Sequence, residues 1–201
     1  MKLQDRLPDA VVCGGKKYRV DLDFRNVLEM LDVLARDDLI EGAKIYRAVR
    51  CVMKRPPRND ARCAEILGAV RGVCFKQSDK PRGPKMTDFE QDADVIRAAF
   101  LQEYGINLWH DRLHWCEFTA LLDALPEGSR YTEILGIRSR PMPAPTKYNA
   151  ELRAWLTKAK AEYAVRLTKR EAENSYQNGL RLMAEGLLSL AASNTGSDEN
   201  G

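Results

Sequence analysis

The chain has few of the features that mark membrane, secreted or strongly nucleic-acid-binding proteins. Its 201 residues contain no run of about eighteen apolar residues, so we expect no membrane-spanning helix and no membrane partner. The first ten residues lack the apolar core of a signal peptide, which predicts an intracellular protein. Acidic and basic side chains nearly balance, and the net charge of +3 falls short of the basic excess of a typical nucleic-acid-binding domain.

The chain also lacks the cysteine and histidine patterns of disulfide or zinc scaffolds. Its five cysteines are an odd number, and none of them forms a CxxC pair. We therefore expect reduced thiols rather than a disulfide framework. His110 and His114 have the HxxxH spacing that places two rings on one face of a helix, but a metalloprotease helix carries Glu directly after its first His, where this chain has Asp111. No third ligand follows, so we expect no metal site.

Catalytic motifs are missing as well. No serine lies in a GxSxG pattern, and Gly14-Gly15 is not followed by the GKS or GKT of a phosphate-binding loop. The acidic run over residues 88–94 has a simpler explanation than metal binding, because the helix dipole favours acidic side chains in the first turns of a helix. The sequence predicts no catalytic residues, no cofactor and no enzyme activity.

What the chain does contain is a clear set of local structure signals. Two short β-prone runs flank Gly14-Gly15 and predict a hairpin over residues 10–21. Beyond it, apolar residues recur at spacings of three and four, and this period is typical of helices. The predicted helices cover residues 24–34, 38–53, 60–73, 87–104, 107–125 and 129–138.

Several of these helices carry recognisable end signals. Asp23, Thr87 and Asn107 are predicted N-caps, and Glu90 completes a capping box with Thr87. Gly105 lies where a left-handed residue ends a helix. Together the signals predict a mainly α fold, a compact bundle of about six helices with an N-terminal β-hairpin. Trp109, Trp115 and Phe118 are expected in its core.

Composition changes after this bundle. Three prolines within residues 139–146 favour an extended linker. We predict a core domain over residues 1–140, a linker over 141–147, a C-terminal amphipathic helical extension over 148–192 and a disordered tail over 193–201. One apolar stripe on the extension must be buried against something, and its aromatic members suit an interface. The predicted partner-binding residues are Tyr148, Leu152, Trp155, Tyr163 and Leu167.

Basic residues gather around the prolines that end the second predicted helix. The cluster between Arg50 and Arg62 could contact phosphates and leaves a helical nucleic-acid-binding or regulatory protein as an alternative. Solvated helix faces interleaved with glutamates explain it at least as well. We therefore do not expect nucleic acid as a partner.

The order of several motifs resembles a known family. The chain reads DLDFRNVLEMLDVLARDDL near its start, IRAAFLQEYGINL in the middle and LHWCEFTALLDALPEGSRYTEILGIR after it. This order is similar to the Gp15-type proteins of long-tailed bacteriophages and prophages, over roughly residues 18–140. The positions that carry the resemblance are Asp23, Phe24, Arg25, Phe100, Tyr104, Gly105, His114, Trp115, Phe118, Ile134, Ile137 and Arg138.

The resemblance implies a function that composition does not reveal. Proteins of this family are regarded as tail assembly chaperones that coat the tape-measure protein and keep it soluble until the tail tube polymerises. The implied partners are the tape-measure protein and further copies of the same chain, with the major tail protein as another candidate. The implied location is the cytoplasm of the bacterial host and not the mature virion. A structural virion component is the main alternative.

Overall fold

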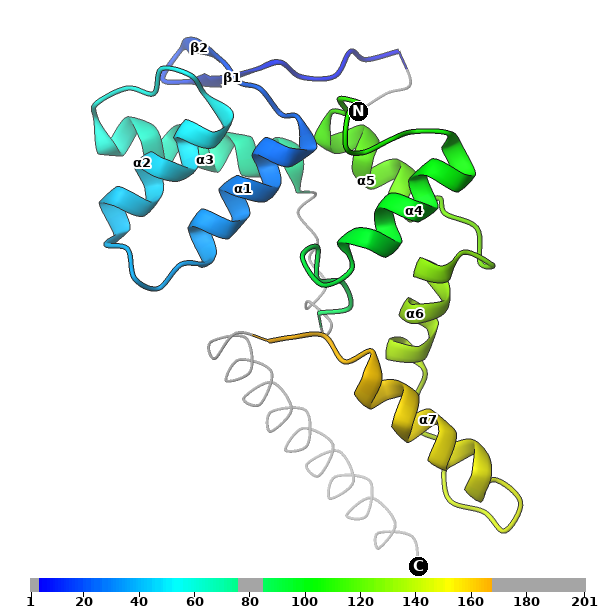
Figure 1. Cartoon of the computed structure of the whole chain (residues 1–201). Helices are drawn as coiled ribbons and strands as arrows, with labels where there is room; N and C mark the ends of the chain where they lie inside the picture. Colours follow the sequence, from blue (N-terminus) through cyan, green and yellow to red (C-terminus); the bar gives the residue numbers. More distant parts are fainter. Residues whose placement is uncertain (1–3, 76–84, 168–201) are drawn as a thin grey trace, which may run out of the picture. The chain divides into compact units, whose positions relative to one another are not determined.

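The computed structural model describes residues 4–75 and 85–167. Within these residues the chain is mainly helical, with an N-terminal two-stranded hairpin, which confirms the predicted fold class. Two compact units can be distinguished (Figure 1). Of the described residues, unit 1 comprises 4–75 and 92–136, and unit 2 comprises 85–91 and 137–167.

The hairpin of unit 1 forms where the sequence predicts it. Strands β1 (Ala10–Cys13) and β2 (Lys16–Arg19) pair in antiparallel register, with Cys13 opposite Lys16. Gly14 and Gly15 both have positive φ values, 53° and 72°, as a two-residue hairpin turn of the primed type requires. A side chain at Gly14 would also collide with the guanidinium of Arg62.

Three helices follow the hairpin. They are α1 (Phe24–Ala35), α2 (Glu41–Val52) and α3 (Asp60–Cys74). Helix α2 packs between α1 and α3, and α3 also packs against β1. The carboxylate of Asp23 accepts a hydrogen bond from the Arg25 amide, so this predicted N-cap is confirmed.

The second half of unit 1 contains α4 (Ala93–Tyr104), α5 (Trp115–Asp123) and the start of α6 (Arg130–Ser139). Gly105 ends α4 at a φ of 66°, as predicted. The predicted start of α4 at Thr87 is wrong. Asp88 instead accepts hydrogen bonds from the amides of Glu90 and Gln91, which holds a turn ahead of the helix.

The predicted helix over residues 107–125 is also wrong in its first third. Asn107 caps only a short turn, through a hydrogen bond that its side chain accepts from the Trp109 amide. The chain then runs extended through Arg112, and α5 begins at Trp115. His110 and His114 therefore do not share a helical face. The spacing was misleading because the backbone here pairs with residues 22–24, which no local pattern reveals.

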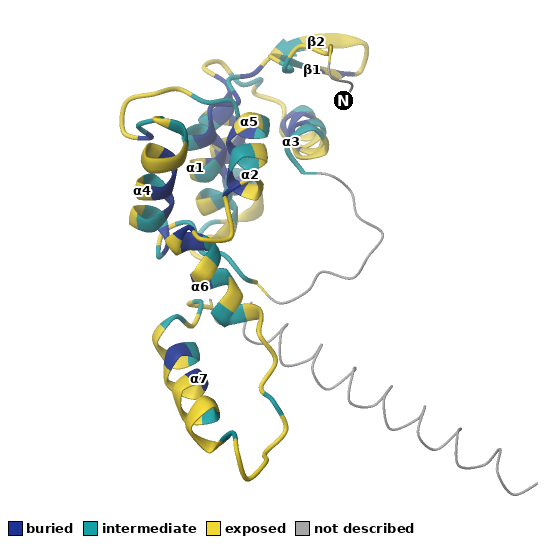
Figure 2. Cartoon of the chain, turned by 90° about the vertical axis from the view of Figure 1, so that its right-hand side faces the viewer, coloured by how far each residue is buried: buried dark blue, intermediate teal, exposed yellow. Residues whose placement is uncertain are grey.

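Aromatic side chains form the centre of unit 1. Phe118 stacks on Phe24 with ring centroids 4.7 Å apart and on Phe100 with centroids 5.3 Å apart. The ring of Trp115 lies 5.8 Å from that of Phe118. All four are at most 6% exposed, and Figure 2 shows the buried inner faces of α1, α4 and α5 that carry them. Such aromatic pairs contribute about 0.5–1.5 kcal/mol each beyond the area they bury. The prediction that Trp115 and Phe118 belong to the core is confirmed.

Unit 2 is built around α7 (Ala150–Glu162). Leu156 and Ala159 are its buried residues. The predicted division into a core over 1–140, a linker over 141–147 and an extension from 148 stays a prediction. Its last parts, residues 168–192 of the extension and the tail over 193–201, lie outside the described residues.

Candidate functional site

The residues that carry the family resemblance meet mainly inside unit 1. Besides the aromatic cluster, the Tyr104 hydroxyl donates to the carbonyl of Leu121 at 2.8 Å and so ties α4 to α5. Ile134 is 4% exposed. These side chains pack the fold.

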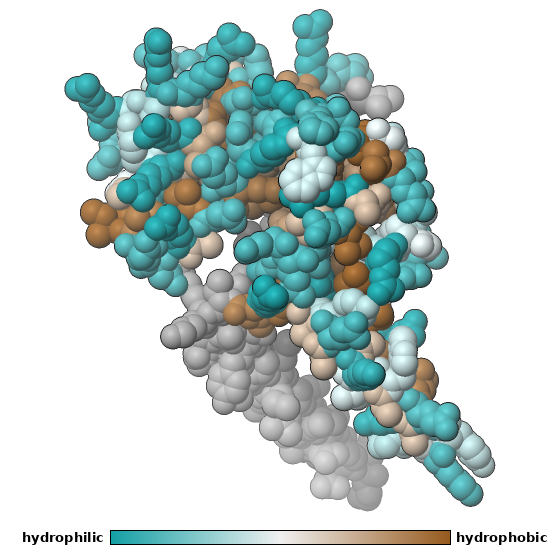
Figure 3. All heavy atoms as spheres, in the orientation of Figure 1, coloured by the Kyte–Doolittle hydropathy of each residue, from teal (hydrophilic) through white to brown (hydrophobic). Residues whose placement is uncertain are grey.

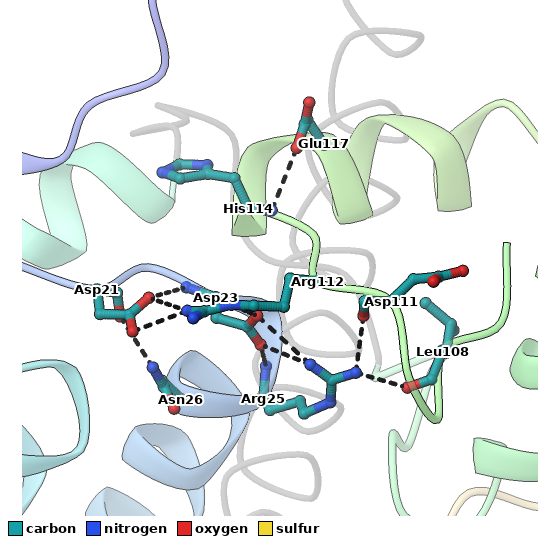
Figure 4. A network of polar contacts seen from close by, with 9 residues as sticks. All are labelled: Asp21, Asp23, Arg25, Asn26, Leu108, Asp111, Arg112, His114 and Glu117. Carbon is teal, nitrogen blue, oxygen red and sulfur yellow. Dashed lines mark hydrogen bonds and ion pairs between the residues drawn. The ribbon is translucent and has the colours of Figure 1, made fainter.

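A polar network joins the start of α1 to the loop before α5 (Figure 4). The Phe24 amide donates to the Leu113 carbonyl, and the Trp115 amide donates to the Leu22 carbonyl at 2.7 Å, so two segments about ninety residues apart run antiparallel. Arg25 lies beneath this bridge. Its guanidinium donates to the Leu108 carbonyl at 3.0 Å and to the Asp111 carbonyl at 2.7 Å.

Asp23 joins the two sides of the network. Its carboxylate lies 3.3 Å from Arg25 and 3.1 Å from Arg112, and its side chain is only 5% exposed. A carboxylate buried to this degree needs such partners, because a buried charge without them is strongly unfavourable. The arrangement is charge-balanced and holds backbone segments together.

Asp21 closes the network on the solvent side. Arg112 donates to both oxygens of its carboxylate, at 2.9 and 2.8 Å. Partial burial acts to raise the pKa of Asp21. The hydrogen bonds from Arg112 and from the Asp23 amide, together with the charge of Arg112, outweigh burial and hold that pKa below its ordinary value of 3.8.

His114 has a capping role in the structure. Its Nδ1 accepts a hydrogen bond from the Cys116 amide, while Glu117 accepts one from the His114 amide, and together they form a capping box for α5. Because Nδ1 accepts, the ring proton is assigned to Nε2, which lies 3.1 Å from the Pro8 carbonyl. The ring therefore also ties the N-terminal segment to α5.

The last two residues that carry the family resemblance, Ile137 and Arg138, lie in unit 2. Arg138 donates from Nε to the Tyr163 carbonyl at 2.6 Å and from Nη1 to the Met86 carbonyl at 2.8 Å. Gln91 links to the same region, since its side-chain Nε2 donates to the Ala164 carbonyl. Ile137 is half-buried beside Arg138 in the chain. Arg138 thus holds together three segments of unit 2.

The prediction that Trp109 belongs to the core is wrong. Its side chain is 64% exposed and covers the guanidinium of Arg97, which lies 3.8 Å from the ring centroid. The reason is that α5 begins only at Trp115 and not near Asn107, which leaves Trp109 in a surface turn. Stacking on an arginine contributes about 0.5–1 kcal/mol at an exposed position.

The predicted partner-binding residues are all in unit 2 and differ in exposure. Tyr148 is 92% exposed, Trp155 52%, Leu152 49% and Leu167 43%. Tyr163 is half-buried. Leu152 and Trp155 are three positions apart in α7 and share one flank of the helix. We refer to Tyr148, Leu152 and Trp155 as the α7 stripe.

Two important residues were missed by reasoning from the sequence. Leu156 is fully buried and anchors α7, although it follows directly after the exposed Trp155. An apolar stripe on a lone helix does not reveal which flank packs. Arg112 pairs with carboxylates 89 and 91 positions away, and no local signal marks such a pair.

Other chemistry is sparse in the part of the chain that the structure covers. Residues 4–75 and 85–167 contain no group of three or more metal-ligating acidic, cysteine or histidine side chains. Over the same residues no helix has the length and apolar character needed to cross a bilayer. Burial, with a smaller contribution from Cys116, raises the pKa of Cys74 to about 12, so its thiol is a poor nucleophile at neutral pH.

A family model described as Bacteriophage Gp15 protein matches residues 3–165. The match covers most of the chain and confirms the resemblance. It also extends the resemblance beyond residues 18–140, because it includes the hairpin and α7. No curated protein and no solved structure matches the chain.

Proposed function

The chain belongs to the bacteriophage Gp15 protein family, and from this premise we propose that it is a tail assembly chaperone that binds the tape-measure protein. In this role it keeps the tape-measure chain soluble in the host cytoplasm until the tail tube polymerises, and it is then displaced and left out of the virion. The working form is an oligomer of identical chains. The role requires binding surfaces and no catalytic residues.

The observation that carries the proposal beyond the family is the α7 stripe. A tyrosine, a leucine and a tryptophan, each at least 49% exposed, lie within eight residues of one unit, on or next to a single helix. Aromatic side chains exposed in this way are the residue types that dominate binding energy at interfaces. A client that is long and rich in apolar helices would be bound through many such contacts, each weak enough to be released.

The test is co-expression of the full chain with the tape-measure protein of the same phage. We expect the tape-measure protein to become soluble and to co-purify with several copies of the chaperone. The double variant Leu152→Ser/Trp155→Ser should abolish co-purification. Insoluble client despite abundant, folded wild-type chaperone would overturn the proposal.

A matched control variant is available in unit 1. Leu101 on α4 is 53% exposed, close to the 49% of Leu152. Leu101→Ser removes a similar exposed apolar side chain outside the α7 stripe and should leave co-purification unchanged. An equal loss in both variants would show that general surface hydrophobicity, and not the stripe, holds the client.

The family membership alone is also consistent with a structural tail component. Purified virions distinguish the two functions, because a component remains in the particle and a chaperone does not. Quantitative mass spectrometry of purified particles should find the chain absent or far below the stoichiometry of the tail proteins. Stoichiometric presence would favour the structural role.

A further inference from the structure

A second candidate binding surface lies in unit 1, between β2 and the end of α2. A hollow of about 760 Å³ is lined by residues 17–21, residues 52–55 and Arg112. Five of these residues are cationic, and Asp21, their acidic neighbour, is already paired with Arg112. Figure 3 shows mostly hydrophilic side chains on the visible surface over β1, β2 and α2. We name this hollow the β2 groove.

Four of the five cationic side chains that line the β2 groove can bind an anion without breaking an existing ion pair. Lys17, Arg19, Lys54 and Arg55 are exposed, and within the described parts of the chain none of their side chains forms an ion pair or a hydrogen bond. Several like charges around one hollow repel each other and attract anions. The groove therefore favours a partner with negative charge.

The backbone of β2 adds a second and independent feature. The Val20 amide donates to the Asp9 carbonyl at 2.9 Å, and the strand register places Tyr18 opposite Val11. Hydrogen-bonded and non-hydrogen-bonded pairs alternate in an antiparallel ladder. The amides and carbonyls of Lys17 and Arg19 consequently point away from β1, along the free edge of the hairpin.

This free edge faces the groove. The Asp21 amide, which has the same orientation as those of Lys17 and Arg19, donates to the Val52 carbonyl at 2.8 Å. The edge is thus held against the end of α2 at one point and opens into the hollow beyond it. Unpaired donors and acceptors of an edge strand are a template for a further strand.

We propose that the β2 groove binds an extended, acidic polypeptide segment that adds a strand to the edge of β2. Carboxylates of the segment would contact Lys17 and Arg19 from the exposed face of the hairpin, with Lys54 and Arg55 on the opposite wall. A second copy of β2 is disfavoured in this position, because its lysine and arginine side chains would meet like charges. The inference does not depend on the chaperone proposal.

The probe for the test is a fluorescent peptide of about ten residues with alternating glutamate and valine, which suits a single strand. We expect the full chain to bind this peptide in anisotropy titrations, with affinity that falls as salt is raised. The same peptide with lysine in place of glutamate should not bind. Equal binding of both peptides would overturn the proposal.

Charge-reversal variants test whether the peptide binds in the β2 groove. Lys17→Glu/Lys54→Glu should weaken peptide binding about tenfold, because it removes two cations that face the carboxylates of the peptide and puts two like charges in their place. Arg50→Glu/Arg71→Glu changes the net charge equally at exposed positions of α2 and α3 that lie outside the groove. This control should bind as the wild type does, and an equal loss would contradict a defined site.

Amide exchange tests the strand addition itself. In two-dimensional NMR spectra, peptide binding should protect the Lys17 and Arg19 amides from hydrogen exchange and leave that of Tyr18 unchanged, because the latter is already paired within the hairpin. Binding without this protection would leave charge attraction alone and overturn strand addition. Tighter binding of a single-stranded oligonucleotide of equal charge, in competition with the peptide, would identify a nucleic-acid site instead.

Discussion

Arginine side chains hold segments of this protein together through backbone carbonyls. Arg25 reaches two carbonyls on the loop before α5, and Arg138 reaches two carbonyls in unit 2. A planar guanidinium can donate in several directions at once, whereas an ammonium group is a single point charge. This geometry suits arginine to positions 25 and 138, which both belong to the residues that carry the family resemblance.

Replacement of Arg25 by lysine should therefore destabilise the fold. Lysine cannot satisfy both carbonyls and Asp23 together, and we expect a loss on the order of 2 kcal/mol in the free energy of unfolding. Arg112→Lys is the comparison, because the Arg112 side chain is 69% exposed and should contribute less than about 1 kcal/mol. Urea unfolding of both variants measures the difference. Equal losses would contradict the role of the carbonyl contacts.

The lowered pKa of Asp21 predicts how the free energy of unfolding changes in acid. The pKa of Asp21 is lower in the folded chain than its ordinary value of 3.8. The ionised carboxylate therefore contributes fully to the free energy of unfolding above that value, and this contribution is lost as the pH falls through the folded pKa. Asp21→Asn should be less stable than the wild type by a constant amount near neutral pH. The difference should shrink below about pH 4. Denaturant unfolding between pH 2 and 7 measures it, and a difference independent of pH would be inconsistent with the lowered pKa.

At the scale of secondary structure, single residues decide where helices end. Asp23 and His114 each cap a helix through a side-chain acceptor, and Gly105 ends α4 in the left-handed conformation. Nothing lies within 4 Å of where a side chain at Gly105 would begin. The requirement for glycine there is therefore conformational and not steric.

Gly105→Ala should lower the free energy of unfolding by about 1 kcal/mol, the usual cost of the left-handed conformation for a residue with a Cβ atom. Gly68 provides a matched control, because it lies inside α3 with equal space around it and an ordinary helical φ. Gly68→Ala should stabilise the chain by roughly 0.5–1 kcal/mol. Thermal unfolding of the two variants should show shifts of opposite sign, and a stabilising Gly105→Ala would be contrary to this account.

At the scale of the whole molecule, α7 places a residue that packs the fold directly beside a residue that we propose binds the tape-measure protein. Leu156 is fully buried, whereas Trp155 is half exposed. Neighbours in a helix point in directions about 100° apart, so one can anchor the helix while the other remains accessible. The two functions of unit 2 should therefore be separable by mutation.

Leu156→Ala should destabilise unit 2 by about 3 kcal/mol, because it leaves a cavity in a packed site. Trp155→Ser should change stability by less than about 0.5 kcal/mol and yet weaken binding of the tape-measure protein. Circular dichroism during urea unfolding, combined with the co-purification assay, measures both properties. A large stability loss in Trp155→Ser would show that the stripe is part of the fold and would weaken its assignment as an interface.

Much of the fold was predictable because its signals are local. The Gly14-Gly15 turn, the Asp23 cap and the Gly105 helix end all depend on conformational preferences of the residues themselves. The start of α5 was not predictable in this way. Its first residue pairs with Leu22, and a contact across so many positions leaves no periodic trace. The helical spacing of His110 and His114 was consequently misread.

The sequence by itself determined the mainly helical class, the hairpin and the family, because periodicity, turn residues and motif order are carried by neighbours along the chain. Only the tertiary structure decided what those motifs do. It put Phe24, Phe100 and Phe118 in one aromatic core, left Leu152 and Trp155 exposed on α7, and opened the free edge of β2 onto a cationic hollow. Burial and edge exposure depend on which distant segments meet, and that is settled only when the chain packs.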